Sequence, residues 1–426
     1  MTMNNQATSI RSRFEDIPLS PEWGFENTRS TEQWTHGYHR YPAKFLPNIV
    51  KKLIEEYTDQ DDLVADFFAG CGTTLVEAKI HGRKSVGVDI NPVAQLITKA
   101  KTIPVSPAQL DLYYAAIQAT VQAYDFENFE IQGLHDRIDY WFAPVNKSKI
   151  AFLYHTILAI DVPNVQNFYL CALSNILKNC SRWLQSGTKP QIDPDKEPAE
   201  PFGAFGVQVR SMLRKNRAFY EELQRLEYLN VDCDIFLEDA RSTSIASESV
   251  AAIITSPPYV TSYEYADIHQ LTGFWFEYIQ SLSDFRKAFI GTFYSLNQEI
   301  TTSSTIGQDI IDQLYVKDRR YAKEVANYFN DMYSVAKEMH RVLRADGHVC
   351  MVIGNTTFKE IKIRSAEVFS DILLSLGFDL VDVIKRSIPH KIIPTIRDKN
   401  SGRFTKLDNK NGKLVYPEEY ILIAKK

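Results

Sequence analysis

Residues 63–72 constrain the fold of this chain more than any other stretch, because a short apolar run leads directly into two glycines. The run Leu-Val-Ala-Asp-Phe-Phe-Ala-Gly-Cys-Gly predicts a buried strand and a tight turn, and Thr73 to Ala78 continue as the start of a helix. Gly70 and Gly72 lack a Cβ, so the backbone can turn sharply and offer amides to a ligand. This unit predicts an α/β fold with a nucleotide-type site.

A second strand, expected at 85–89, ends on Asp89, an acid placed where nucleotide-binding folds hold a ribose hydroxyl. A dinucleotide fingerprint would carry a glycine three residues after Gly72, and this chain has Leu75 there. The spacing therefore speaks against a dinucleotide-binding site.

Apolar periodicity predicts further strands at 231–237, 250–255, 347–353, 379–385 and 419–424, which together give seven. Helical spacing is found at 46–57, 110–124, 150–160, 165–184, 207–228, 321–343 and 361–376. The expected fold class is α/β, a doubly wound and mostly parallel sheet with a largely helical insertion. The expected domains are an N-terminal arm (1–34), a core domain (35–104 and 231–426) and the insertion (105–230).

Composition limits the classes of partner. The 426 residues carry a net charge of −5, so the chain as a whole is not a basic nucleic-acid binder. Residues 385–413 nevertheless hold nine lysines and arginines, Lys391 and Arg397 among them, against two aspartates. This stretch either meets phosphates or forms a solvated loop.

The five cysteines show no metal-binding spacing, and no apolar run reaches the ~18 residues that span a bilayer. We therefore expect a cytoplasmic protein without a metal or a membrane partner. A second basic feature is the helix at 207–228, where Arg210, Arg214 and Arg217 share one side. This side of the helix either follows a nucleic-acid backbone or is the solvent-exposed face of an amphipathic helix.

The motif Ser256-Pro257-Pro258-Tyr259 directly follows the strand at 250–255. Ligands of such sheets bind at the carboxyl ends of strands near the switch point, so the motif and the glycine turn should face one cleft. An exocyclic amino group of a base is a poor nucleophile, because its lone pair is delocalised into the ring. The Ser256 hydroxyl and the Pro257 carbonyl are suited to accept its hydrogens.

Residues 66–73, taken with Ser256-Pro-Pro-Tyr259, resemble the motifs of DNA amino-methyltransferases that use S-adenosylmethionine. The resemblance implies the class I methyltransferase fold, with an antiparallel last strand. Serine in the first position of the second motif resembles the cytosine-N4 group, whereas Asp or Asn is usual for adenine-N6.

The resemblance also implies roles for individual residues. The segment 39–45 would close over the methionine end of the cofactor, Asp89 would hold the ribose, and Asp239 would lie near the adenine amino group. Pro258 would stiffen the turn, and Tyr259, with Tyr263 and Tyr265, would offer aromatic faces to a flipped-out base. The implied cofactor-binding residues are Tyr41, Lys44, Phe45, Asp66, Phe68, Gly70, Gly72, Thr73, Asp89 and Asp239.

The function that this resemblance implies is methylation of cytosine N4 in a specific sequence of double-stranded DNA. The position of the insertion (105–230) and its basic helix make it a candidate target-recognition region, and residues 280–320, another stretch outside the sheet, are the alternative. The setting would be restriction-modification or defence, with a cognate restriction endonuclease as a further partner. Methylation of adenine N6 and a non-catalytic subunit that binds nucleic acid are the alternatives.

Overall fold

The computed structural model describes residues 14–26, 32–125, 129, 134–185, 190–260, 265–291, 300–388, 396–398, 412–414 and 418–426. The chain divides into two compact units. The glycine-turn unit consists of Ser30–Ala240 and Tyr263–Phe289. The serine-motif unit consists of Met1–Arg29, Arg241–Ser262 and Ile290–Lys426.

Seven strands form one mixed sheet in the order β3-β2-β1-β4-β5-β11-β8. Strands β1, β2 and β3 pair in parallel, as do β4 and β5, while β11 runs antiparallel to both β5 and β8. The expected fold class, with its antiparallel last strand, is therefore confirmed. The sheet strands are β1 (Leu63–Asp66), β2 (Lys84–Asp89), β3 (Cys233–Leu237), β4 (Val250–Thr255), β5 (Leu343–Ile353), β8 (Asp379–Ser387) and β11 (Glu418–Lys425).

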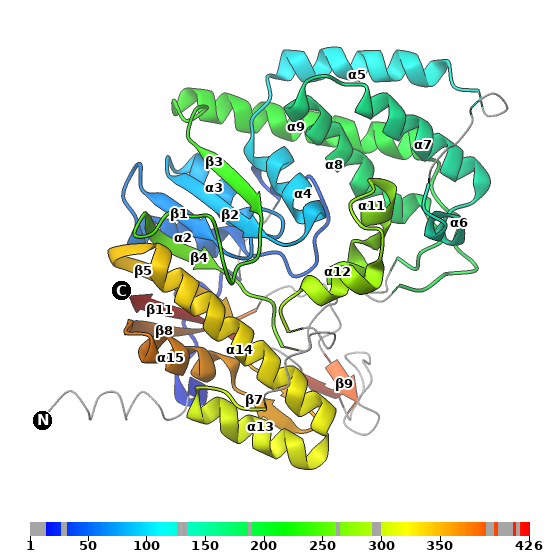
Figure 1. Cartoon of the computed structure of the whole chain (residues 1–426). Helices are drawn as coiled ribbons and strands as arrows, with labels where there is room; N and C mark the ends of the chain where they lie inside the picture. The colour runs from blue at the N-terminus through cyan, green and yellow to red at the C-terminus, as the bar shows by residue number, and fades with distance from the viewer. Residues whose placement is uncertain are drawn as a thin grey trace, which may run out of the picture. The chain divides into compact units, whose positions relative to one another are not determined.

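The serine-motif unit also contains two short antiparallel pairs and a group of helices. The pairs are β6 (Thr356–Phe358) with β7 (Ile361–Ile363) and β9 (Ile396–Asp398) with β10 (Gly412–Leu414). Its helices are the 3-10 turns η1 (Phe14–Asp16) and η2 (Pro21–Trp23), and α13 (Thr305–Lys317), α14 (Arg319–Val342) and α15 (Ser365–Ser375). Figure 1 shows α13, α14 and α15, in yellow to orange, gathered beside β8 and β11.

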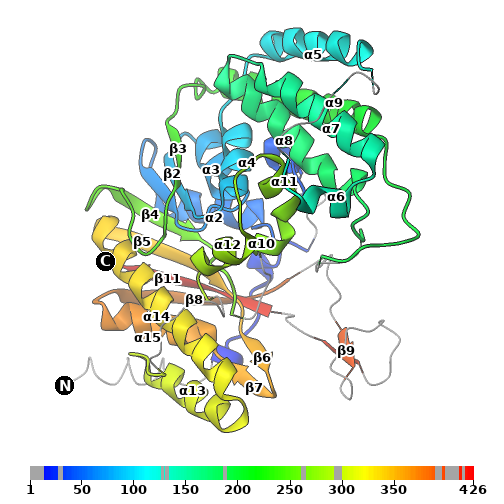
Figure 2. The ribbon, with the colours of Figure 1, turned by 45° about the vertical axis from the view of Figure 1, so that its right-hand side comes forward.

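The glycine-turn unit is mostly helical outside its three strands. Its helices are η3 (Trp34–Gly37), α2 (Pro47–Tyr57), α3 (Thr73–Ile80), α4 (Pro92–Thr102), α5 (Pro107–Gln122), α6 (Arg137–Trp141), α7 (Pro144–Leu158), α8 (Pro163–Cys180), α9 (Pro201–Arg225), α10 (Tyr265–Ile268), α11 (Gln270–Trp275) and α12 (Leu282–Ala288). Figures 1 and 2 both show α5, α7, α8 and α9 lying together.

Local sequence explains where the helices next to the strands begin. Pro47 stands in the first turn of α2, and the apolar side of this helix, formed by Ile49, Val50, Leu53 and Ile54, is buried. Helix α4 begins after Asn91, whose side chain accepts a hydrogen bond from the amide of Val93. That cap places the end of β2 directly before a helix N-terminus.

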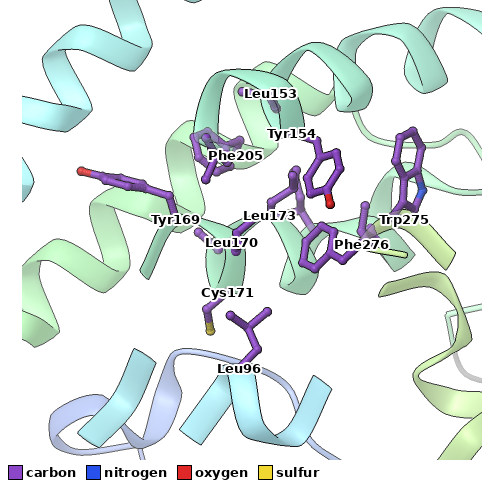
Figure 3. Packing of buried hydrophobic residues seen from close by; sticks show 14 of the residues in the cluster. Leu96, Leu153, Tyr154, Tyr169, Leu170, Cys171, Leu173, Phe205, Trp275 and Phe276 are labelled. Carbon is purple, nitrogen blue, oxygen red and sulfur yellow. The ribbon is translucent and has the colours of Figure 1, made fainter. Parts of the chain in front are cut away.

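The helical insertion has its own core within the glycine-turn unit. Figure 3 shows Tyr169, Leu170, Cys171 and Leu173 of α8 among the side chains of that core, with Phe205 of α9 also pointing into it. Leu96 of α4 belongs to the same cluster, so the insertion packs directly on a helix of the β-α-β-α unit. The insertion is thus not a separate globule.

The N-terminal segment differs from the arm expected from its polar sequence. Phe14 and Trp23 are buried, and the Ser20 amide donates to the carbonyl of Lys385 in β8. Residues 14–26 therefore pack on the serine-motif unit. Within 280–320, a stretch expected to lie outside the sheet, the structure has the helices α12 and α13.

In the part of the chain that the structure describes, no helix is both long and apolar enough to cross a membrane. Within the same part of the chain, no group of three or more His, Cys, Asp or Glu side chains is arranged to hold a metal ion.

Candidate active site

The glycine turn adopts a backbone that needs glycine at two positions. Gly70 and Gly72 have φ angles of +49° and +76°, in the left-handed region where a Cβ is strained. An added Cβ at Gly72 would lie 2.9 Å from the side chain of Thr98, whose hydroxyl donates to the Gly70 carbonyl at 3.2 Å. Helix α4 therefore holds the turn from one side.

Asp89, the acid expected to hold the ribose, lies against this turn. Its two carboxylate oxygens accept hydrogen bonds from the amides of Gly70 at 2.8 Å and Asn91 at 2.9 Å. Burial raises the pKa of Asp89 to about 6, although these two hydrogen bonds pull it down, and nearby Asp66 adds a smaller upward shift. Each oxygen keeps a lone pair for a further donor.

Asp66 and its neighbours shape the start of the turn. Asp66 is buried at the end of β1, and its carboxylate accepts from the Phe68 amide at 3.1 Å. Thr73, the first residue of α3, is buried, and its hydroxyl oxygen lies 3.8 Å from the Cys71 sulfur. The structure thus gathers Asp66, Phe68, Gly70, Gly72, Thr73 and Asp89 in one short region.

The predicted closing segment contributes one residue to this region. The Tyr41 ring lies beside the turn, since an added Cβ at Gly70 would be 3.3 Å from it. Lys44 forms an ion pair with Glu32 at 2.5 Å, and Phe45 is half-buried just before α2. Asp239 follows the end of β3 and is half-buried.

Tyr265 and His269 also contact Tyr41, and the sequence did not indicate His269. The ring of Tyr265 stacks on that of Tyr41 with 6.1 Å between centroids, and His269 lies at 5.0 Å. The expectation that Tyr265 offers an aromatic face to the target base stays a prediction, and Tyr263 lies outside the described residues. The only signal for His269 in the sequence is that it follows Tyr259 of the Ser-Pro-Pro-Tyr motif by ten residues.

The tautomer of His269 follows from its neighbour. Because the Asn91 side-chain oxygen already accepts from Val93, its amide nitrogen donates to His269 Nδ1, 2.6 Å away, and the ring proton sits on Nε2. Burial lowers the pKa of His269 to about 4, so the ring is neutral near pH 7. Nε2 is buried and has no hydrogen-bond partner among the described residues.

The second motif lies in the serine-motif unit, at the end of the fully buried strand β4. The Ser256 hydroxyl donates to the Val352 carbonyl of β5 at 3.2 Å. Its proton is therefore engaged, which leaves the oxygen lone pairs as acceptors. Pro257 is buried, and Pro258 is half-buried.

Two tyrosine hydroxyls fix the rest of the motif. The buried Tyr328 of α14 donates to the Pro258 carbonyl at 2.7 Å. The Tyr259 hydroxyl donates to Glu419 of β11 at 3.0 Å. Burial, followed by the negative charge of Glu419, holds the pKa of Tyr259 well above its usual range, so the phenol keeps its proton. All four residues of the motif are therefore held by backbone constraint or hydrogen bonding.

The residues predicted to bind DNA are placed in part. Arg210, Arg214 and Arg217 are exposed on α9, opposite the buried Val209, Met212, Phe219 and Leu223. Arg217 forms an ion pair with Asp111 at 2.8 Å. Arg397 lies in β9, with Lys413 as its register partner, and Lys391 lies outside the described residues.

Comparison with known proteins gives the family. A model described as DNA methylase matches residues 1–100 and 250–426, which together exceed half of the chain. The chain belongs to the DNA methylase family. That model spans both classes of amino-methyltransferase, those acting on adenine N6 and those acting on cytosine N4. The protein is thus a DNA amino-methyltransferase, and the unmatched range, 101–249, contains the expected insertion.

Two curated relatives support the assignment. The Type II methyltransferase M.MvaI of Kocuria varians is 26% identical over 410 residues, which cover 89% of this DNA methylase and 88% of the relative. The Type II methyltransferase M.BsoBI of Geobacillus stearothermophilus is 23% identical over 275 residues, or 56% and 52% of the two chains. The similarity to M.MvaI thus extends over most of both sequences.

A solved structure of a SAM-dependent methyltransferase from Methanosarcina mazei is 10% identical to this DNA methylase. It covers 88% of this chain and 96% of its own, with a TM-score of 0.30. A superposition at this score carries no argument, and the fold assignment rests on the strand order.

The cofactor of this DNA methylase is S-adenosylmethionine, and the glycine-turn unit has the chemistry to hold it. Gly70 and Gly72, whose backbone is in the left-handed region, add no side chains of their own to the turn. Asp89 retains acceptor capacity for hydroxyl groups, and the buried Nε2–H of His269 is a donor without a protein partner in the described part of the chain. Both donors and acceptors are thus available within one unit.

Proposed function

We propose that this methyltransferase transfers a methyl group to N4 of a cytosine that is flipped out of a specific sequence in double-stranded DNA. S-adenosylmethionine supplies an electrophilic methyl group bound to sulfur. The protein must hold the amino nitrogen in line with that methyl and accept the hydrogens of the amino group. Positioning of this kind can contribute roughly 7–11 kcal/mol to lowering a barrier.

The state of the Ser256 hydroxyl carries the proposal. Because Ser256 donates its proton to Val352, its oxygen turns acceptor lone pairs to an incoming amino group. A carboxylate at this position would accept without needing such a partner. The Pro257 carbonyl is the second proposed acceptor, and Pro258 stiffens the turn because its φ is fixed.

Tyr259 supplies a ring on which the flipped base stacks in this proposal. Extrusion from the duplex costs a few kcal/mol, roughly, which stacking and polar contacts offset. Sheets of this class bind their ligands at the carboxyl ends of strands, and the glycine turn and Ser256 each follow such a strand end, that of β1 and that of β4.

The modified base tests the proposal directly. DNA from cells that express the protein would be digested to nucleosides and analysed by mass spectrometry, with cells expressing a Ser256→Ala variant as the control. We expect abundant N4-methylcytosine in the first sample and a much smaller amount in the control. N6-methyladenine in its place would establish the adenine alternative. The absence of both modified bases would favour a non-catalytic subunit.

A second prediction concerns the pH dependence of cofactor binding through Asp89, which we propose holds the ribose. Its carboxylate must be ionised to accept two hydroxyls, and its pKa in the free protein is about 6. Affinity should therefore fall as the pH drops through that value, because the protonated form loses acceptor capacity.

Calorimetry with S-adenosylhomocysteine between about pH 5 and about pH 7 measures the effect. Affinity should drop roughly tenfold between about pH 7 and about pH 5, and about fivefold of that loss should occur in the lowest pH unit. The matched variant Asp89→Asn, which cannot ionise, should bind weakly with a flat profile over the same range. A flat profile in the unmodified protein would remove Asp89 from the ribose site.

We propose that Arg210, Arg214 and Arg217 of α9, with Lys391 and Arg397, contact the DNA backbone. The exposure of the three arginines on one helix favours this surface, while the Asp111 ion pair reduces the charge that Arg217 offers. The family assignment requires DNA as substrate, and phosphate contacts normally dominate affinity.

Both relatives are Type II methyltransferases, which supports a restriction-modification setting with a cognate endonuclease. All five cysteines are free thiols, and the four at 71, 171, 180 and 350 are buried, which suits a reducing cytoplasm.

A further inference from the structure

A line of polar contacts behind Tyr259 connects the motif to the last strand and to the N-terminal segment. The Tyr259 hydroxyl donates to one oxygen of Glu419 at 3.0 Å, and the other oxygen pairs with Arg386 of β8. Arg386 in turn donates from Nε to the Trp23 carbonyl at 2.7 Å. Glu419 belongs to no motif of the sequence, and Arg386 was counted only among the basic residues of 385–413.

Burial makes this line of contacts rigid. Only 1% of Arg386 and 9% of Glu419 is exposed, so neither charge can turn to water without losing its partner. Removing one member of a buried ion pair is costly, since the other is left uncompensated. The carboxylate therefore stays in place, and the phenol oxygen of Tyr259 is held at one point.

The ring of Tyr259 is also restrained at its edge. A Cβ added at Gly354, just after β5, would lie 2.8 Å from Cε2 of the ring, so the ring rests on bare backbone there. Backbone contact on the ring and a fixed hydroxyl at its tip together select one orientation of the side chain.

We propose that Glu419 and Arg386 are positioning residues that hold the ring plane of Tyr259 for stacking on the flipped base. The inference rests on the proposed stacking role of Tyr259, and it applies equally to cytosine and to adenine. Without the anchor the ring visits other orientations, and the base is held in line with the methyl group for a smaller fraction of the time.

The variant Tyr259→Phe tests this, because it removes only the hydroxyl and leaves the Glu419–Arg386 pair intact. Turnover would be measured with S-adenosylmethionine and genomic DNA from cells that lack the enzyme. We expect kcat to fall about tenfold, with an unchanged KM for the cofactor. The unfolding midpoint should fall only modestly, because one oxygen of the buried Glu419 loses its donor while the ion pair with Arg386 remains.

The matched control is Tyr113→Phe, which removes a hydroxyl that donates to a carboxylate, that of Asp161, at 2.9 Å in the glycine-turn unit. This variant should keep the kcat of the unmodified protein. An unchanged kcat in Tyr259→Phe, or an equal fall in both variants, would overturn the proposal.

A double-mutant cycle with Glu419→Gln separates positioning from independent effects. In Glu419→Gln the one remaining oxygen should stay on Arg386, so the Tyr259 hydroxyl loses its acceptor. The single variant should lose about tenfold in kcat, and adding Tyr259→Phe should cause no further loss, since both changes remove the same hydrogen bond. Losses that multiply would overturn the proposal. Where Glu419→Gln lowers the yield of folded protein, the Tyr259→Phe result decides alone. If the unmodified protein methylates neither cytosine nor adenine, the proposed function fails instead, and the two failures are distinct.

Discussion

Replacing Ser256 by alanine should reduce kcat about 100-fold while leaving the affinity for S-adenosylmethionine unchanged. The hydroxyl that donates to Val352 would be gone, and with it an acceptor for the amino group of the base. The Pro257 carbonyl would remain, so some activity should persist. Single-turnover kinetics on unmethylated DNA and calorimetry with S-adenosylhomocysteine measure the two quantities.

The control for this variant is Ser249→Ala. Ser249 lies just before β4, and its hydroxyl also donates to a backbone carbonyl, that of Ala246, at 2.8 Å. Its loss should affect neither turnover nor affinity. Equal losses of turnover and cofactor affinity in Ser256→Ala would mean that the serine serves the cofactor rather than the base.

Replacing Gly72 by alanine should destabilise the protein by about 2–5 kcal/mol and weaken cofactor binding at least about tenfold. Left-handed backbone costs a residue with a Cβ about 1–2 kcal/mol, and overlap in a packed region adds about 1–3 kcal/mol. Here the new Cβ would lie 2.9 Å from the Thr98 side chain and 3.2 Å from its Cα. Because Thr98 also bonds to the Gly70 carbonyl, relief of the overlap moves the turn itself.

Gly377 offers a control for the backbone strain alone. Its φ is +93°, and an added Cβ would meet nothing within 4 Å. Gly377→Ala should therefore cost only about 1–2 kcal/mol and leave cofactor affinity unchanged. Urea unfolding and calorimetry on both variants check the pair of expectations. Similar stabilities for the two variants would show that the Thr98 contact relaxes freely.

Strands and helices with strong local patterns were predictable from the sequence. The strand at 250–255 has the predicted bounds, because six apolar or small residues between turn signals fit only a buried strand. The glycine turn and the cap at Asn91 follow equally local rules.

Features that depend on unusual turns or on distant segments were not predictable. The hairpin β6–β7 turns through Lys359 and Glu360, both with positive φ, where glycine or asparagine would have given the signal. The arm expected at the N-terminus packs on β8 because Phe14 and Trp23 find buried positions there. His269 reaches Asn91 and Tyr41 across 178 and 228 residues, respectively.

The amino-acid sequence by itself determined the strand, the two-glycine turn, Asp89 and the Ser-Pro-Pro-Tyr motif, since each depends on sterics and polarity among near neighbours. Only the tertiary structure decided what holds these groups. Glu419 lies 160 residues from Tyr259 in the sequence. Arg386 becomes the partner of Glu419 because the pairing of β8 with β11 sets these two residues opposite each other. Such contacts follow from the order in which strands pack, and no local pattern encodes that order.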